Sequence, residues 1–299
     1  MVRSAQTSLM LVLTIILALG TVPIFAQDDT NATKEAYNEG LSQMQQGNLQ
    51  MAETMFKTAI DRDPNYVDAH LNLGVVYFQN KQYDEALEQF KRVVEIDPKS
   101  VDGFANLGRV ENKLRRRAEA EVAFESALAI EPENTEILKE LGKVRYIRKK
   151  YAEAAGHLQK CHEVGGGDQT THYYLGKAYQ KMDQLADAIA SFKKALELNS
   201  NYYGAHFALG QIYLGQEKYS KAARSFKAAM KANPKKPKAA YNYAVAMESQ
   251  DSENIDDNIG NWNAYIKRAK NDVKEKNSVA IAQQHVKDLQ ERKEKLQYE

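Results

Sequence analysis

"LGVVYFQNKQYDEALEQFKRVVEIDP", residues 73–98, is the stretch of sequence that decides the fold. Its apolar residues recur at helical spacing, and the polar run "NKQ" at 80–82 interrupts them. Pro98 closes the stretch, and proline cannot continue a helix because it lacks a backbone N–H and its ring clashes with the preceding turn. The stretch therefore predicts a helix, a short turn and a second helix.

The pattern of this stretch returns at a constant interval along the chain. Ala86 and Phe90 belong to columns of small and large apolar residues, and Pro98 belongs to a column of prolines that closes four units. Small residues let the two helices of one unit approach each other closely. Because a single helical hairpin cannot bury its apolar face alone, neighbouring units must stack. A third column holds glycine in six successive units: Gly40, Gly74, Gly108, Gly142, Gly176 and Gly210.

Residues 73–98 closely resemble the tetratricopeptide repeat, and the resemblance covers about residues 33–270. It implies two antiparallel helices in each unit, stacked into a right-handed superhelix with a concave groove. The expected fold class is therefore an all-α, right-handed solenoid. After the repeats, residues 277–297 have the spacing of a C-terminal capping helix, whose polar outer face solenoids need for solubility. We count seven units, which start near Thr33, Val67, Val101, Thr135, Gln169, Tyr203 and Pro237.

Residues 1–26 have the three-part plan of a secretory signal peptide. Arg3 makes the start positive, residues 9–20 are almost wholly apolar, and Ala26 precedes a polar run. The apolar run is shorter than the roughly 20 residues that span a bilayer, so we expect cleavage after Ala26. Residues 27–32 are then a short polar linker, and the protein is periplasmic or secreted, most readily in a bacterial envelope. Membrane contact is expected only if the segment stays uncleaved.

Composition and motifs argue against several functional classes. A net charge of +1 does not suit a whole-domain nucleic-acid binder, and the single cysteine excludes an intramolecular disulfide. Phosphate loops, nucleophile elbows and HExxH motifs are missing, so we expect neither catalytic residues nor a cofactor. His157, Cys161 and His162 come nearest to a metal site. Cys161 stands in the column of small buried residues, however, and zinc needs three or four converging ligands, so we expect no metal.

The resemblance implies that the first helix of each unit lines the groove, which identifies candidate partner-binding residues. Arg109, Lys143 and Lys177 occupy one column in three successive units, and at about 10 Å per unit they would form a basic ladder about 20 Å long. The alternative is that these charges form only a solvated face. The complete set of groove candidates is Arg109, Lys139, Lys143, Lys177, Asn112, Tyr146, Tyr173, Phe207 and Tyr241.

These candidates favour a non-enzymatic scaffold that binds an extended peptide or a partner protein, with an acidic segment facing the ladder and apolar or aromatic groups at its ends. A polysaccharide-binding accessory of polymer export is the alternative, with Tyr173, Tyr202, Tyr203, Phe207 and Tyr241 stacking on sugar rings. A self-assembling array is a third class, but the capping helix favours a monomer. Residues 115–117, "RRR", are expected in a turn on the outer edge.

Overall fold

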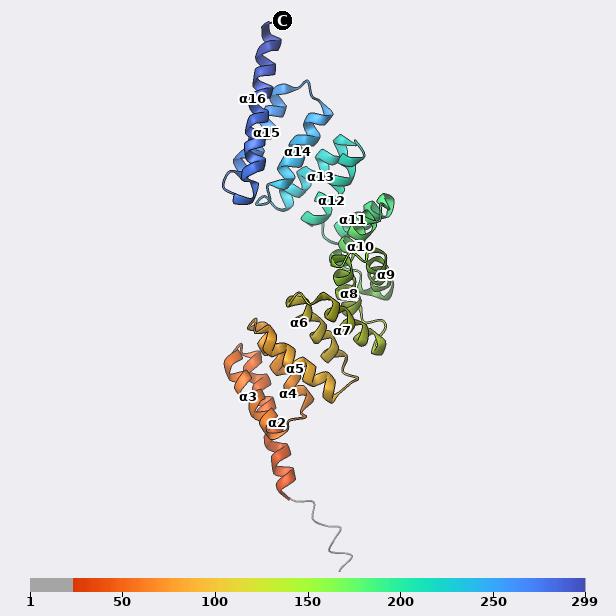
Figure 1. The fold of residues 1–299 in the computed structure, drawn as a ribbon, viewed down its shortest axis with the longest axis vertical. Coiled ribbons are helices and arrows are strands. Elements are labelled where there is room, and N and C mark those ends of the chain that lie inside the picture. Colours follow the sequence, from red (N-terminus) through yellow and green to blue (C-terminus); the bar gives the residue numbers. More distant parts are fainter. Residues whose placement is uncertain (1–23, 299) are drawn as a thin grey trace, which may run out of the picture. The chain divides into compact units, whose positions relative to one another are not determined.

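The computed structural model of the chain describes residues 24–298, so the apolar run at 9–20 lies outside the described residues. Between residues 24 and 298 the regular elements are helices (Figure 1). Apart from two short helical turns, they are α2 (Ile24–Gln45), α3 (Leu49–Arg62), α4 (Val67–Gln79), α5 (Tyr83–Ile96), α6 (Val101–Lys113), α7 (Arg117–Ile130), α8 (Thr135–Ile147), α9 (Tyr151–Cys161), α10 (Gln169–Lys181), α11 (Leu185–Leu198), α12 (Tyr203–Gly215), α13 (Tyr219–Ala232), α14 (Lys238–Gln250), α15 (Ile255–Ala269) and α16 (Lys276–Tyr298).

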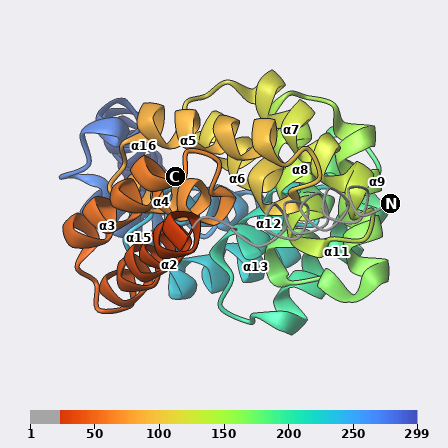
Figure 2. The same ribbon diagram turned by 90° about the horizontal axis from the view of Figure 1, so that it is seen from below.

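These helices form consecutive helix–turn–helix pairs, which confirms the all-α repeat fold predicted from the sequence. The members of a pair, such as α2 and α3 or α12 and α13, pack along each other (Figure 2). The chain divides into two compact units. The first ends at Pro132 and includes the pairs from α2 to α7, and the second begins at Glu133 and includes the pairs from α8 to α15 together with α16.

The glycine column marks the contact between the two helices of each pair. A Cβ atom added to Gly74 of α4 would lie only 2.6 Å from Cε1 of Phe90 on α5, far inside van der Waals contact. Phe90 is 1% exposed, so its ring cannot turn away into solvent. The same contact recurs between Gly40 and Phe56, Gly108 and Phe124, Gly142 and Leu158, Gly176 and Phe192, and Gly210 and Phe226.

The turn inside each pair also repeats, although its residues differ. Lys81 has φ 62° in the left-handed region, and the next residue, Gln82, donates its backbone N–H to the carbonyl of Tyr77 at 2.9 Å. This hydrogen bond closes the C-terminus of the first helix, as in a Schellman motif. The equivalent positions of successive units share the left-handed conformation: Gly47, Lys81, Arg115, Lys149, Asp183 and Glu217.

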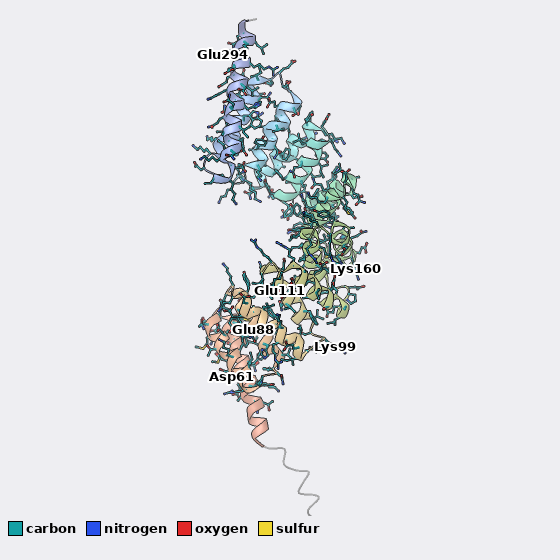
Figure 3. The ribbon with its side chains drawn as sticks, viewed as in Figure 1. Asp61, Glu88, Lys99, Glu111, Lys160 and Glu294 are labelled. Carbon is teal, nitrogen blue, oxygen red and sulfur yellow. The ribbon has the colours of Figure 1, made fainter. Side chains whose placement is uncertain are left out.

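The three arginines at 115–117 therefore have different surroundings. Arg115 occupies the left-handed position of its turn, and Arg117 is the first residue of α7. Arg116, between them, lies 3.7 Å from carboxylate oxygens of both Asp84 and Glu111, and Glu111 is labelled in Figure 3. Their expected place at the turn is confirmed, with the correction that Arg117 already belongs to the helix.

The two ends of the repeat differ from the sequence prediction in detail. Helix α2 begins at Ile24, so residues 27–32 belong to this helix and the predicted linker is wrong. Nothing after Pro23 stops a helix, because neither glycine nor proline occurs before Gly40. At the other end α16 contains the expected capping segment, although Ile281 and Leu296 point away from its buried side and are 64% and 56% exposed. None of the helices between residues 24 and 298 combines the length and apolarity of a membrane span.

Gly210→Ala tests the helix contact. The added methyl group would meet the Phe226 ring at 2.6 Å, so we expect the free energy of unfolding to fall by about 1–3 kcal/mol. Gly215→Ala, on the same helix, is the matched control: its methyl group meets no atom within 4 Å, and alanine favours helix over glycine. Chemical unfolding followed by circular dichroism measures both. Equal effects of the two substitutions would contradict a packing role for the glycine column.

Candidate functional site

The predicted basic ladder is divided between the two compact units. Arg109 and Asn112 lie half-buried on α6 of the first unit, where the Arg109 guanidinium donates to the side-chain oxygen of Asn106 at 2.9 Å. Lys143 and Lys177 lie on α8 and α10 of the second unit. The ladder across this division therefore stays a prediction, and the site is described below within the second unit.

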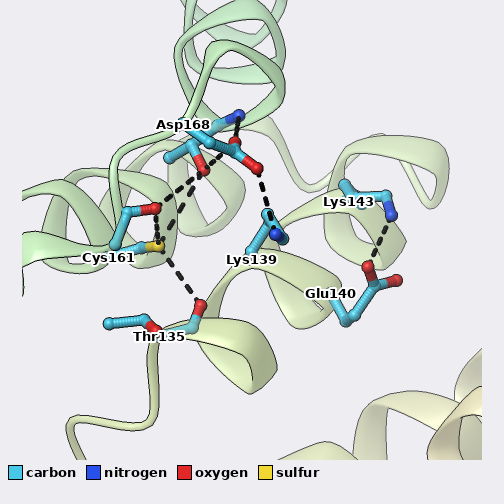
Figure 4. A network of polar contacts seen from close by, with 8 residues as sticks. Thr135, Lys139, Glu140, Lys143, Cys161 and Asp168 are labelled. Carbon is cyan, nitrogen blue, oxygen red and sulfur yellow. Dashed lines mark hydrogen bonds and ion pairs between the residues drawn. The ribbon is translucent and has the colours of Figure 1, made fainter.

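Two of the predicted cations already have carboxylate partners (Figure 4). The ammonium of Lys139 lies 3.1 Å from a carboxylate oxygen of Asp168, and that of Lys143 lies 2.6 Å from Glu140. Glu140 precedes Lys143 by three residues, a spacing that the sequence could have revealed. Asp168 lies in the next unit of the repeat, far along the chain from Lys139, and local spacing does not reveal such a pair. These two lysines are therefore compensated within the protein itself.

Asp168 is a structural cap at the start of α10 (Figure 4). Its side chain accepts hydrogen bonds from the backbone N–H of Thr171 at 2.7 Å and from the Thr171 hydroxyl at 2.8 Å. Burial favours the neutral acid, but the hydrogen bonds from Thr171 and the charge of Lys139 outweigh it and lower the pKa of Asp168. Beside them the thiol of buried Cys161 donates to the carbonyl of Thr135 at 3.2 Å. This cluster holds the helix ends together.

Lys177 differs from these two lysines. It is half-buried on α10, and its ammonium donates to the neutral side chain of Gln180 at 3.1 Å. Burial, assisted by the nearby Lys181, lowers the pKa of Lys177. In the described part of the chain, no carboxylate forms an ion pair with Lys177. A ligand carboxylate would therefore meet a charge that is not yet compensated.

Lys177 lines a pocket of about 430 Å³, which we call the aromatic pocket. It is formed by residues of α10, by residues of α12 with Tyr202 just before it, and by one residue of the segment between α13 and α14. Its polar lining consists of two lysines, one glutamine and the tyrosine hydroxyls, and no carboxylate lines it. The residues that line it are Tyr173, Lys177, Tyr202, Tyr203, Gly204, Phe207, Ala208, Gln211 and Lys236.

The rings of the aromatic pocket have fixed mutual orientations. Tyr203 and Phe207 are stacked, with centroids 5.6 Å apart and planes at 13°. Tyr173 and Tyr202 meet edge to face at 5.2 Å. The ammonium of Lys236 lies 4.4 Å from the centroid of Tyr203, within the range of a cation–π interaction. Burial, together with the neighbouring tyrosines, raises the pKa of Tyr173 to about 12, so its hydroxyl stays protonated at neutral pH.

The structure brings together only some of the predicted groove residues. Tyr173, Lys177 and Phe207 share the aromatic pocket. Tyr146 instead packs against Tyr151 and Tyr174, with ring centroids 5.6 Å away in both cases. Tyr241 packs against Trp262 and Tyr265 and lines a separate pocket of about 300 Å³, to which α16 contributes.

The candidate set omitted Lys236 and Gly204. The residue just before a first helix packs against a groove residue of the preceding unit: Tyr66 meets Tyr37, Asp168 meets Lys139, and Tyr202 meets Tyr173. Lys236 follows Tyr202 by one full repeat, so this column was the signal that could have identified it. Gly204 is required because a Cβ there would lie 2.8 Å from the Tyr173 ring.

Two histidines near this region lie against each other, and of the two His172 is buried whereas His162 is exposed. The rings of His162 and His172 are 4.7 Å apart, whereas His157 contacts Arg145 on α8. Burial lowers the pKa of His172, and the proximity of His162 and Lys194 adds to this effect. Across residues 24–298, no group of three or more His, Cys, Asp or Glu side chains is placed to hold a metal ion.

His172 predicts a pH dependence of stability. Its lowered pKa means that the folded state binds a proton less readily than the unfolded state, so stability should fall as the pH drops below about 6.5. His172→Leu, with the residue that Leu138 supplies one unit earlier, should remove this loss. It should also add about 1 kcal/mol at neutral pH, because the buried Nε2 has no hydrogen-bond partner among the described residues.

Melting temperatures at pH 7.5 and 5.5 measure this effect. His206→Leu, at the same repeat position but half-exposed, is the control and should keep the pH dependence of the unaltered protein. The same loss of melting temperature in all three proteins would contradict the role of His172.

Comparison with known proteins agrees with this architecture. One family model, described as a tetratricopeptide repeat, matches residues 37–101, 106–161 and 207–269, and a second model with the same description matches residues 170–202. Together these matches cover more than half of the chain. A search of curated proteins found no match.

Several solved structures share the fold. MamA is 24% identical and aligns over 57% of this chain and 94% of its own, with a TM-score of 0.54. YrrB, described as a TPR protein with an unusual peptide-binding site, is 22% identical over 62% of this chain and 96% of its own, with a TM-score of 0.56. PilF of Pseudomonas aeruginosa is 19% identical and aligns over 72% of this chain and 96% of its own, with a TM-score of 0.60. The chain is therefore a member of the tetratricopeptide repeat family.

Proposed function

We propose that this protein is an exported, non-enzymatic adaptor. It holds an extended segment of a partner protein against the first helices of the repeats in its second compact unit. The aromatic pocket is the observation that carries this proposal. It lies mainly on the first helices α10 and α12, and it combines aromatic rings with two lysines and a glutamine, a mixed lining that is typical of ligand sites. Tyr173, Tyr202 and Phe207 also pack against the core, so these walls are held in place by the fold.

The lining of the pocket favours a peptide over a polysaccharide. Sugar sites combine aromatic rings with Asp, Asn or Arg side chains that bind hydroxyl groups, and none of these three residue types lines the aromatic pocket. The stacked rings of Tyr203 and Phe207 could carry a sugar, but the ammonium of Lys236 covers Tyr203. YrrB is described as having a peptide-binding site, and its likeness in fold is consistent with a peptide ligand here.

Export rests on the sequence of residues 1–26, with Arg3 before the apolar run and Ala26 before the polar one. We place the mature adaptor in the periplasm or outside the cell.

Site-specific photo-crosslinking tests the binding face. A photoreactive amino acid at Gln211, which is exposed and lines the aromatic pocket, should capture a partner protein from envelope extract. The control places it at Lys193, which is exposed on the second helix α11. The partner should crosslink at least tenfold more from position 211, as judged by mass spectrometry of the adducts. Equal capture from both positions, or none from either, would contradict the proposal.

A reporter fusion tests export separately. Residues 1–40 joined to alkaline phosphatase, which needs disulfides formed outside the cytoplasm, should give an active enzyme. The mature N-terminus, read by mass spectrometry of the full chain, should be Gln27. An inactive fusion would show that the segment does not direct export.

A further inference from the structure

The charges of the aromatic pocket set one requirement on its ligand. The ammonium groups of Lys177 and Lys236 both line it, and no carboxylate does. Lys177 uses one of its three N–H donors on Gln180, and the remaining two have no carboxylate partner within residues 24–298. Keeping a half-buried ammonium without a counter-charge costs free energy, and a ligand carboxylate placed there would offset that cost.

The rings set a second requirement. The rings of Tyr173 and Tyr202 meet edge to face, and the rings of Tyr203 and Phe207 are stacked nearly parallel. The four rings together form the apolar walls of the pocket. Gly204 at the start of α12 brings the backbone against the Tyr173 ring and keeps this corner free of a side chain. A flat apolar group fits such walls best, because aromatic pairs gain about 0.5–1.5 kcal/mol beyond the burial of their area.

Size limits the ligand further. A volume of about 430 Å³ is near the lower end of the range for ligand pockets, which runs from about 300 to 1,000 Å³. One large side chain and part of its neighbour fill such a space. The long ladder of charges predicted from the sequence is not required for this, since Lys139 and Lys143 are paired with Asp168 and Glu140.

We infer that the aromatic pocket selects an aromatic side chain that is directly followed or preceded by a carboxylate, the ring lying between Tyr173 and Phe207 and the carboxylate facing Lys177 and Lys236. This inference rests on the proposed function, because it names the ligand of the same site. The carboxylate can come from an internal Asp or Glu or from the C-terminus of the partner.

Fluorescence anisotropy with defined peptides and the mature full chain tests this selectivity. The labelled probe is Ser-Gly-Asp-Phe-Asp-Gly-Ser with an amidated end. Replacing its Phe by Ala, or both Asp by Asn, should weaken binding at least tenfold. A probe that ends in Gly-Phe with a free carboxylate separates the two sources of charge: binding comparable to that of the internal probe assigns the site to chain ends as well, and weaker binding assigns it to internal acids.

Variants of the protein connect the selectivity to the pocket. Lys177→Gln should weaken the binding of the Asp-Phe-Asp probe at least fivefold, because this probe carries the carboxylates. The weak binding of the probe with Asn in place of both Asp should stay unchanged. Lys193→Gln on α11 is the matched control, since it removes an exposed lysine outside the pocket. Gly204→Ala changes no charge, but its methyl group would displace the Tyr173 ring and should weaken every probe that contains Phe.

Equal binding of all probes, no binding of any probe at 1 mM, or equal effects of Lys177→Gln and Lys193→Gln would overturn the inference. None of these results would contradict the adaptor function, which the crosslinking experiment tests independently. A partner captured from Gln211 whose bound segment lacks an aromatic–acidic pair would retain the adaptor function and reject only this selectivity.

Discussion

The contact between a backbone glycine of the first helix and a buried ring of the second is the constraint on which the rest of the structure depends. Gly74 admits the Phe90 ring to within a distance that excludes any side chain, and the constant interval of the repeat copies this contact from pair to pair. Each copy fixes how closely the two helices of one pair approach. Within each compact unit, successive pairs can then pack against each other at a constant spacing.

This constraint also leaves part of the chain free to vary. Once glycine, alanine and phenylalanine occupy the contact, the groove-facing side chains of the first helices can differ in chemistry from repeat to repeat. At the same column the chain carries Arg109, Lys143, Lys177 and Gln211, each with different surroundings. Function can therefore differ from unit to unit while the fold stays the same, and the aromatic pocket is one such local solution.

The fold could be predicted from the sequence because its signals are periodic. Gly74, Phe90 and Pro98 define the helices, and α16 ends one residue beyond the predicted capping segment. The start of α2 could not be predicted, since residues 27–32 lack both a stop signal and an apolar pattern. Of the site, Tyr173, Lys177 and Phe207 were predictable from their columns.

The compensation of charges was not predictable in the same way. The pairing of Lys139 with Asp168 joins positions in different units, and it depends on the exact approach of α8 to the start of α10. The place of Lys236 over Tyr203 depends likewise on the segment between α13 and α14. Equivalent positions of the repeat show which residues share a face of the helices. They do not show which of the charged residues already form an ion pair within the protein.

The left-handed turns have a consequence for how this chain tolerates change. Lysine, arginine, aspartate and glutamate all adopt a conformation that costs residues with a side chain about 1–2 kcal/mol and glycine almost nothing. The backbone hydrogen bonds of the turn impose that conformation whatever the side chain. At each of the five positions a conformational cost therefore lowers the stability of the fold. Glycine there, as already found at Gly47, would relieve this conformational cost while the backbone hydrogen bonds of the turn stay in place.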